Sequence, residues 1–306
     1  NYFLIAMNRL QRLAATALLS VAAIGLQASA TSTQDAESAF LWEIETPTNS
    51  VYLMGSIHYL RPTDYPLAPA VQAAFQDAEN LVFEVHPAEL LDPSTAMAFL
   101  QGAAPDSQAE ALQIALQPGT ESYELVKDAA LEFGLPIEPF HQFEPWFLAM
   151  TLSSTQLMQL GFSPESGVEL QLYEQAMATG KSVSGLETVE QQLGFFDNLS
   201  VPTQVEFLTQ TAQDLDSLGP ALDSLVASWK TGDVEQFESL AMGELTEFSE
   251  INDVLLTQRN LNWIPQIEAL MGRSEDYLVV VGSAHLVTDD GLVSLLEDRG
   301  YTVNQL

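Results

Sequence analysis

The chain has 306 residues, 47% of them hydrophobic, and carries 42 acidic against 9 basic side chains, for a net charge of −33. The apolar content is enough to bury a full core, while the negative charge argues against nucleic acid and anionic lipid as partners, because both present phosphates. There is no cysteine, so disulfides and thiolate chemistry are excluded, and any metal must be held by His, Asp or Glu.

The first 30 residues have the organisation of a secretory signal peptide, and the first six read as an over-extended start. Arg9 and Arg12 form a basic region, residues 13–26 are apolar, and Ala28-Ser29-Ala30 fits a small-residue cleavage motif. We therefore expect cleavage after Ala30 and a periplasmic or secreted location. An uncleaved anchor is the alternative, although the apolar run is shorter than the ~20 residues that span a bilayer. No later run reaches that length.

The next segment predicts two strands, a helix and a further strand. Residues 39–45 and 50–54 predict a β-hairpin, and residues 66–79 place apolar side chains on one face of a helix. Residues 81–85 form another apolar strand. A strand–helix–strand unit has parallel strands, so we expect strand 81–85 to lie directly beside strand 50–54.

Residues 88–272 predict a largely helical insertion, interrupted by two short strand-like segments at 136–140 and 182–186. The helical runs are 121–133, 144–160, 166–179, 188–198, 202–228 and 247–271. The chain then returns to a strand at 276–281, a helix at 288–298 and a strand at 301–303. The expected fold is α/β: a single domain, residues 31–306, with a mixed sheet and parallel β-α-β units at both ends of the chain.

The sharpest chemical feature is a repeated motif at the ends of two predicted strands, Gly55-Ser56-Ile57-His58 and Gly282-Ser283-Ala284-His285. Ligands of open α/β sheets bind outside the carboxyl ends of the strands. Glu84 ends the strand expected next to that of His58, and neighbouring strands lie ~4.8 Å apart, so the two side chains can converge. One such motif alone usually means a turn, and a structural salt bridge is the alternative for Glu84.

Further polar residues follow the two short strand-like segments. Glu187 and His141 could complete a set of two His and two Glu that holds a divalent cation and a water, with a spare carboxylate as general base. Arg259 could orient a carboxylate or bind a substrate carbonyl, with a surface ion pair as its alternative. The role of His86 is left open, since it points to the opposite face from Val85 and could share the neighbourhood of Glu84 only through a bend in the chain.

The motifs resemble those of the TraB/GumN family, which includes PrgY and the Tiki proteases, over about residues 40 to 305. The matching segments are Leu41-Trp-Glu-Ile, Tyr52-Leu-Met-Gly-Ser-Ile-His58, Phe83-Glu-Val, Pro145-Trp146, Gly167-Val-Glu169, Gly185-Leu-Glu-Thr188, Arg259-Asn260 and Val281-Gly-Ser-Ala-His-Leu286. Members are similar in fold to ChaN-like and erythromycin-esterase-like proteins. Where the family often has Gly-x-Asp, this chain has the longer Glu169.

The resemblance implies a divalent-metal-dependent peptidase that uses manganese or cobalt, with zinc or iron as other options. His58 and His285 would hold the metal or stabilise an oxyanion, and Glu84 would be a ligand or a base. Glu187 and Arg259 would support them. We thus expect a secreted or periplasmic hydrolase acting on a peptide or small molecule. The alternatives are a non-catalytic haem-, iron- or peptide-binding protein of the same fold and an ester-cleaving enzyme.

Overall fold

The computed structural model describes residues 38–108, 110–242 and 249–306, which divide into two compact units. The first unit comprises Ala88–Phe162 and Val189–Gly219, and the second comprises residues 38–87, Ser163–Thr188 and Pro220–Leu306. The first unit therefore falls inside the range predicted as a helical insertion. The signal peptide predicted at residues 1–30 lies outside the described residues and stays a prediction, as does the single-domain organisation.

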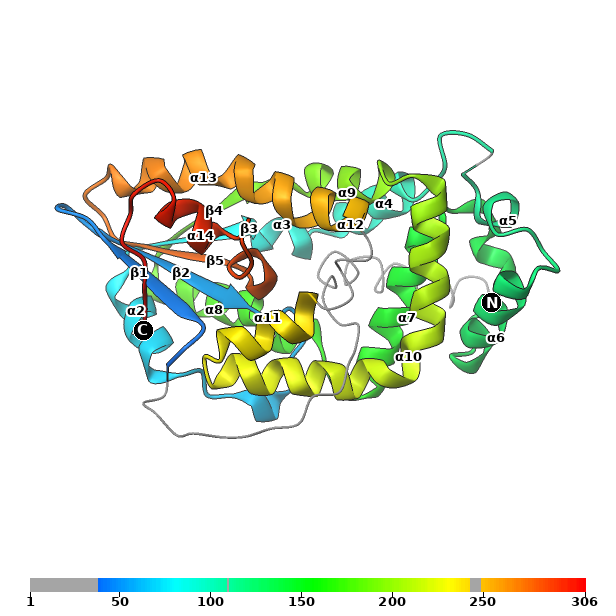
Figure 1. Cartoon of the computed structure of the whole chain (residues 1–306), viewed down its shortest axis with the longest axis horizontal. Coiled ribbons are helices and arrows are strands. Elements are labelled where there is room, and N and C mark those ends of the chain that lie inside the picture. The colour runs from blue at the N-terminus through cyan, green and yellow to red at the C-terminus, as the bar shows by residue number, and fades with distance from the viewer. Residues whose placement is uncertain (1–37, 109, 243–248) are drawn as a thin grey trace. The chain divides into compact units, whose positions relative to one another are not determined.

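The second unit is built on a mixed six-stranded sheet, which confirms the predicted α/β fold (Figure 1). Its strands are β1 (Leu41–Glu45), β2 (Ser50–Ser56), β3 (Asn80–Val85), β4 (Ser182–Glu187), β5 (Tyr277–Gly282) and β6 (Asn304–Gln305). Their order across the sheet is β4-β3-β5-β2-β1-β6. The predicted hairpin is present, with β1 antiparallel to β2, and β6 pairs antiparallel with the other edge of β1.

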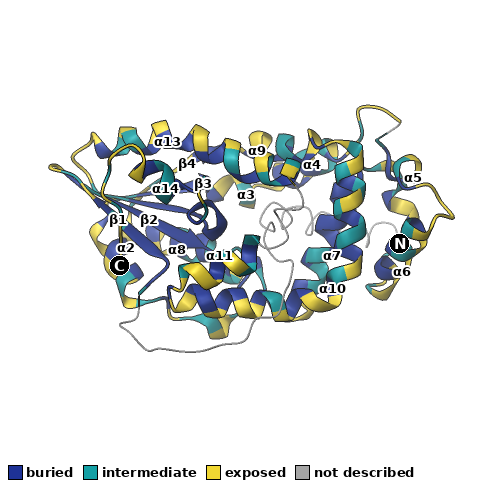
Figure 2. Ribbon diagram, in the orientation of Figure 1, coloured by how far each residue is buried: buried dark blue, intermediate teal, exposed yellow. Residues whose placement is uncertain are grey.

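The central strand of this sheet was not predicted by the order of elements along the chain. β5 lies between β2 and β3 and is parallel to both, so the expected direct pairing of residues 50–54 with 81–85 is wrong. The β-α-β rule fixes the relative direction of two strands, but it allows a third strand to lie between them. β5 suits the centre because successive residues of its apolar run, Leu278–Gly282, are all buried. The strands of the sheet are largely dark blue, and so buried, in Figure 2.

The strand order also places the helices of this unit. They are α2 (Pro69–Asp77), α8 (Val168–Thr179), α11 (Val234–Met242), α12 (Ser249–Asn252), α13 (Gln258–Met271) and α14 (Leu292–Glu297). The steps from β2 to β3 and β4 run one way across the sheet, and those to β5 and β6 run the other way. Right-handed crossovers then put α2 and α8 on one face and α13 on the other, as Figure 1 shows.

Several expected elements of the second unit differ in detail. The helix predicted at 247–271 is instead α12, a π-helical turn at Asp253–Thr257 and α13, with residues 247–248 outside the described part. Short 3-10 turns occur at Pro62–Asp64, Pro164–Ser166 and Ser283–His285. The last strand lies slightly later than expected, at β6, since that is where the chain reaches the edge of β1.

The first unit is helical and closes around aromatic side chains. Its helices are α3 (Pro87–Leu91), α4 (Pro93–Gly102), α5 (Leu112–Ala115), α6 (Glu121–Glu132), α7 (Pro145–Gln159), α9 (Val189–Asp197) and the part of α10 (Val201–Lys230) before Pro220. Trp146, fully buried on α7, packs edge-on against Phe99 and stacks on Phe196. The strand predicted at 136–140 is wrong, because two prolines in it remove backbone donors and the chain forms a 3-10 turn at Glu138–Gln142.

One buried acid of the first unit has a raised pKa. Glu144, 2% exposed, accepts a 2.6 Å hydrogen bond from Gln204 Nε2. Burial, with the nearby Asp197, raises the pKa of Glu144 to about 7.

Among the residues that the structure describes, no helix is both long and apolar enough to cross a bilayer.

Candidate functional site

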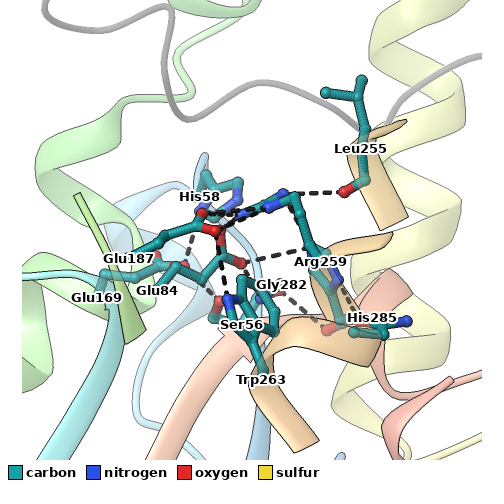
Figure 3. Close-up of polar contacts among 12 residues, drawn as sticks. Ser56, His58, Glu84, Glu169, Glu187, Leu255, Arg259, Trp263, Gly282 and His285 are labelled. Atoms are coloured by element: carbon teal, nitrogen blue, oxygen red, sulfur yellow. Dashed lines mark hydrogen bonds and ion pairs between the residues drawn. The ribbon is translucent and has the colours of Figure 1, made fainter. Parts of the chain in front are cut away.

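Five side chains expected at the site meet at the carboxyl edge of the sheet in the second unit (Figure 3). They are His58 just after β2, Glu84 in β3, Glu187 at the end of β4, Arg259 in α13 and His285 in the turn after β5. The crossovers change direction at this point of the sheet, which is where open α/β sheets bind ligands. Their roles in binding and catalysis stay predictions.

Gly282 allows His58 and Glu84 to approach each other across the intervening strand. With β5 between them, β2 and β3 are two strand spacings apart, which is roughly 10 Å. A Cβ on Gly282 would lie 3.2 Å from Glu84 Oε1, 3.5 Å from His58 Nε2 and 3.6 Å from His285 Cδ2. The missing side chain therefore leaves the space in which these three groups converge, and the Gly282 N–H donates to Glu84 Oε1 at 2.6 Å.

Arg259 forms the centre of the polar network. Its Nη2 donates to Glu84 Oε2 and to Glu187 Oε1, each at 2.5 Å, and its Nε donates to Glu187 Oε1 at 3.1 Å. Its Nη1 donates to the Leu255 carbonyl at 2.9 Å and lies 3.1 Å from His285 Nε2. Every N–H of the guanidinium thus has an acceptor.

Glu187 and Trp263 hold the guanidinium in place. Trp263 Nε1 donates to Glu187 Oε2 at 3.2 Å, and the Arg259 guanidinium lies over the Trp263 ring at 4.7 Å from its centroid. Trp263 is 1% exposed and so belongs to the core, and it also orients a charged group.

His285 is held neutral in one tautomer. A guanidinium only donates, so His285 Nε2 accepts from Arg259, and Nδ1–H donates to Asn260 Oδ1 at 2.7 Å. Burial, reinforced by the Arg259 charge, lowers the pKa of His285 to about 3. Sequence reasoning included Asn260 only as part of a motif, because its contact depends on how α13 lies beside the turn after β5.

His58 is paired with an acid from α8. His58 Nδ1 lies 2.7 Å from Glu169 Oε1, which also accepts a short hydrogen bond from Ser56 Oγ. A Cβ on Gly167 would lie only 2.2 Å from the His58 carbonyl oxygen, so glycine there lets the start of α8 reach this turn. Glu169 was visible in the sequence only as a variant motif residue, and its place in the first turn of α8 favours the carboxylate.

The charges of the cluster shift the protonation of its members. Burial alone would raise the pKa of Glu84, but Arg259 and the two imidazoles lower it to about 2. Burial would lower the pKa of His58, whereas Glu169 and Glu84 outweigh it and raise that pKa. The Arg259 pKa is raised as well, since Glu84 and Glu187 outweigh its burial.

The predicted metal ligands have suitable chemistry but not a suitable arrangement. Two imidazoles and a carboxylate suit manganese, cobalt, zinc or iron. However, Glu84 Oε2 and His285 Nε2 already accept from the cationic Arg259. No three His, Asp or Glu side chains among the described residues are arranged to hold a metal ion. As placed, His58, Glu84 and His285 do not fit a metal.

The two remaining histidines make contacts with other side chains. His86, just after β3, packs its ring edge-on against Tyr173. His141 belongs to the first unit, where its Nε2 lies 2.9 Å from the Tyr123 hydroxyl. The place of His141 in the expected ligand set stays a prediction.

Fold and site together define an α/β protein with a buried His–Glu–Arg cluster at the carboxyl edge of a mixed sheet. The chain belongs to the TraB/PrgY/gumN family, whose model matches residues 40–305. The resemblance seen in its motifs is thereby confirmed.

The chain is similar to two relatives, which it matches over different shares of their length. The chain is 26% identical to the uncharacterized protein YbaP of Escherichia coli (strain K12) over 83% of its own length and 90% of that protein. It is 25% identical to a "Metalloprotease TIKI homolog" of Amphimedon queenslandica over 57% of its own length and 39% of that protein. No solved structure matches the chain.

Proposed function

We propose that this chain is a hydrolase of peptide bonds, secreted or periplasmic, in which His58 is the general base. The observation that carries the proposal is the accessibility of His58 within an otherwise buried cluster. Its side chain is 19% exposed, whereas those of Glu84, Arg259 and His285 are 10% or less exposed. A substrate and its attacking water would therefore meet His58 first.

The contacts of His58 suit proton transfer. The negative charge of Glu169, whose Oε1 forms an ion pair with Nδ1 at 2.7 Å, favours the tautomer with the proton on that nitrogen, and Nε2 is then the acceptor beside the space at Gly282. In the proposed reaction Nε2 takes a proton from water, and the water oxygen bonds to the carbonyl carbon. The carbon–nitrogen bond then breaks, and His58 returns the proton to the amine that leaves.

The other charged groups of the cluster would support this proton transfer through their effect on His58. Arg259 keeps Glu84 ionised, and Glu84 in turn stabilises a His58 that has accepted a proton. Every Arg259 donor is engaged, so it would act as a positioning residue rather than contact the substrate.

The choice of a peptide bond and of a metal rests on the family rather than on the site. The name of the Amphimedon queenslandica relative favours a metalloprotease, and the match covers 39% of that protein. Dependence on manganese or cobalt would extend the proposal. The reaction above uses no metal, because Glu84 and His285 already accept hydrogen bonds from Arg259.

The alternative of haem binding is less well supported by the geometry. Axial ligation by two histidines needs a free nitrogen on each, and both ring nitrogens of His285 are hydrogen-bonded.

The test is cleavage of a library of random-sequence synthetic peptides, followed by mass spectrometry. We expect the wild-type chain to produce defined fragments and the His58→Gln variant to lose this activity by about 100-fold or more. His86→Gln is the matched control, because it changes the same residue type just after β3, where the His86 ring packs against Tyr173. Circular dichroism would confirm that both variants are folded.

Equal cleavage by wild type and folded His58→Gln would overturn the assignment of His58. No cleavage by wild type, with or without added manganese or cobalt, would overturn the peptidase.

A further inference from the structure

We infer that Arg259 is the resident cation of this site and that a divalent metal ion and the Arg259 guanidinium exclude each other there. The inference concerns the same cluster as the proposed function. It assigns to an amino acid the positive charge that the family resemblance assigns to a metal.

The first step concerns the lone pairs that accept hydrogen bonds from the Arg259 guanidinium. Arg259 takes Glu84 Oε2 at 2.5 Å and His285 Nε2 at 3.1 Å, and the other carboxylate oxygen, Glu84 Oε1, already accepts from the Gly282 N–H at 2.6 Å. His285 Nδ1 is not a substitute, since it bonds to Asn260 at 2.7 Å. Removing the guanidinium is therefore a precondition for a metal held by these residues.

The second step is that Arg259 is fixed from its other side. The π-helical turn Asp253–Thr257 presents the Leu255 carbonyl to Nη1, and Trp263 lies under the guanidinium plane. Glu187 engages both Nε and Nη2. These contacts are independent of Glu84 and His285, so Arg259 would not move aside when a metal ion approaches.

The third step is the balance of charge. Glu84 and Glu187, both buried, face one guanidinium, and a divalent ion beside it would add like charge at close range in a poorly solvated place. Without Arg259 the same two carboxylates would lose their counter-charge and His285 Nε2 would lose its donor, and these donor types suit manganese, cobalt and zinc.

The experiment measures metal binding without any substrate, so its result is separate from whether peptides are cleaved. Chelator-treated protein is dialysed against manganese, cobalt or zinc chloride and analysed for metal. We expect no stoichiometric metal in wild type, one equivalent in Arg259→Met, and loss of that equivalent in Arg259→Met/His285→Ala. Arg299→Met is the matched control, because Arg299 is a part-exposed arginine of the same unit that lies 3.8 Å from Glu268.

One equivalent of metal in wild type that is lost in Glu84→Gln or His285→Ala would overturn the inference. A folded Arg259→Met variant that binds no more metal than wild type would overturn it as well.

A second measurement decides the question if Arg259→Met does not fold. Nitrogen-15 NMR of wild-type histidine side chains should show the neutral Nδ1–H form of His285, unchanged when metal is added. Metal-dependent loss or shift of the His285 Nε2 signal would overturn the inference.

Discussion

Replacing Gly282 by alanine would put a methyl group into the space where His58, Glu84 and His285 converge. Its carbon would lie 3.2 Å from Glu84 Oε1 and 3.5 Å from His58 Nε2. The backbone at Gly282 has φ −53° and ψ 136°, which alanine adopts without strain. Since the tightest contact is with the end of a side chain, the loss from crowding is offset by the about 0.4–1 kcal/mol that alanine gains over glycine. We expect stability to change by no more than about 1 kcal/mol.

Gly55→Ala, the same substitution in the other copy of the motif, should instead lower the stability of the protein. A Cβ on Gly55 would lie 2.5 Å from Phe40 Cδ1 and 2.7 Å from Ser283 Oγ, both buried. Overpacking of this kind costs about 1–3 kcal/mol. Gly55→Ala should therefore lower the melting temperature by several degrees, at about 2–4 °C per kcal/mol.

The two variants are compared by thermal unfolding and by rate of peptide cleavage. Gly282→Ala should melt within a few degrees of wild type and lose about 100-fold or more in rate, because it displaces the reacting groups. Gly55→Ala should be the less stable variant and retain measurable cleavage. Wild-type rates in folded Gly282→Ala would refute the reasoning, since the substrate would then not use the space beside Gly282.

Three further substitutions test other parts of the structure. Glu169→Gln should slow cleavage by about 10²–10⁴-fold with little change in melting temperature, because His58 loses its charged partner; an unchanged rate would contradict this. Arg259→Met should lower the free energy of unfolding in urea by about 3–5 kcal/mol, since it leaves two buried carboxylates without a counter-charge, and a loss below about 1 kcal/mol would count against the network. Glu144 has a raised pKa, so it contributes stability that is fully present below about pH 4.5 and is lost as pH rises through about 7. Glu144→Gln should remove this part of the pH dependence, measured as the difference from wild type in urea unfolding, and a parallel pair of curves would contradict the assignment.

Local patterns were enough to predict most strands and the residues of the site. The apolar runs of β2, β3 and β5 and the polar residues that end them are all visible along the chain. Because parallel strands present their carboxyl ends at one edge, His58, Glu84 and His285 were expected together, and the structure places them together.

The features that local patterns did not predict depend on contacts between residues that are distant in sequence. The position of β5 between β2 and β3 is set by burial of the whole sheet, and it makes Gly282 rather than strand adjacency the reason that His58 meets Glu84. The pairing of Glu169 with His58 joins residues that are far apart along the chain. The occupation of His285 Nε2 by Arg259 depends on how α13 packs.

The most direct test of the central claim is hydrolysis in water enriched in oxygen-18, with the random-sequence peptide library as substrate. If His58 activates water at this site, the new carboxyl termini made by wild type will carry one heavy oxygen, and folded His58→Gln will make almost none. Products that appear equally in both proteins, or no products from wild type, would contradict the account.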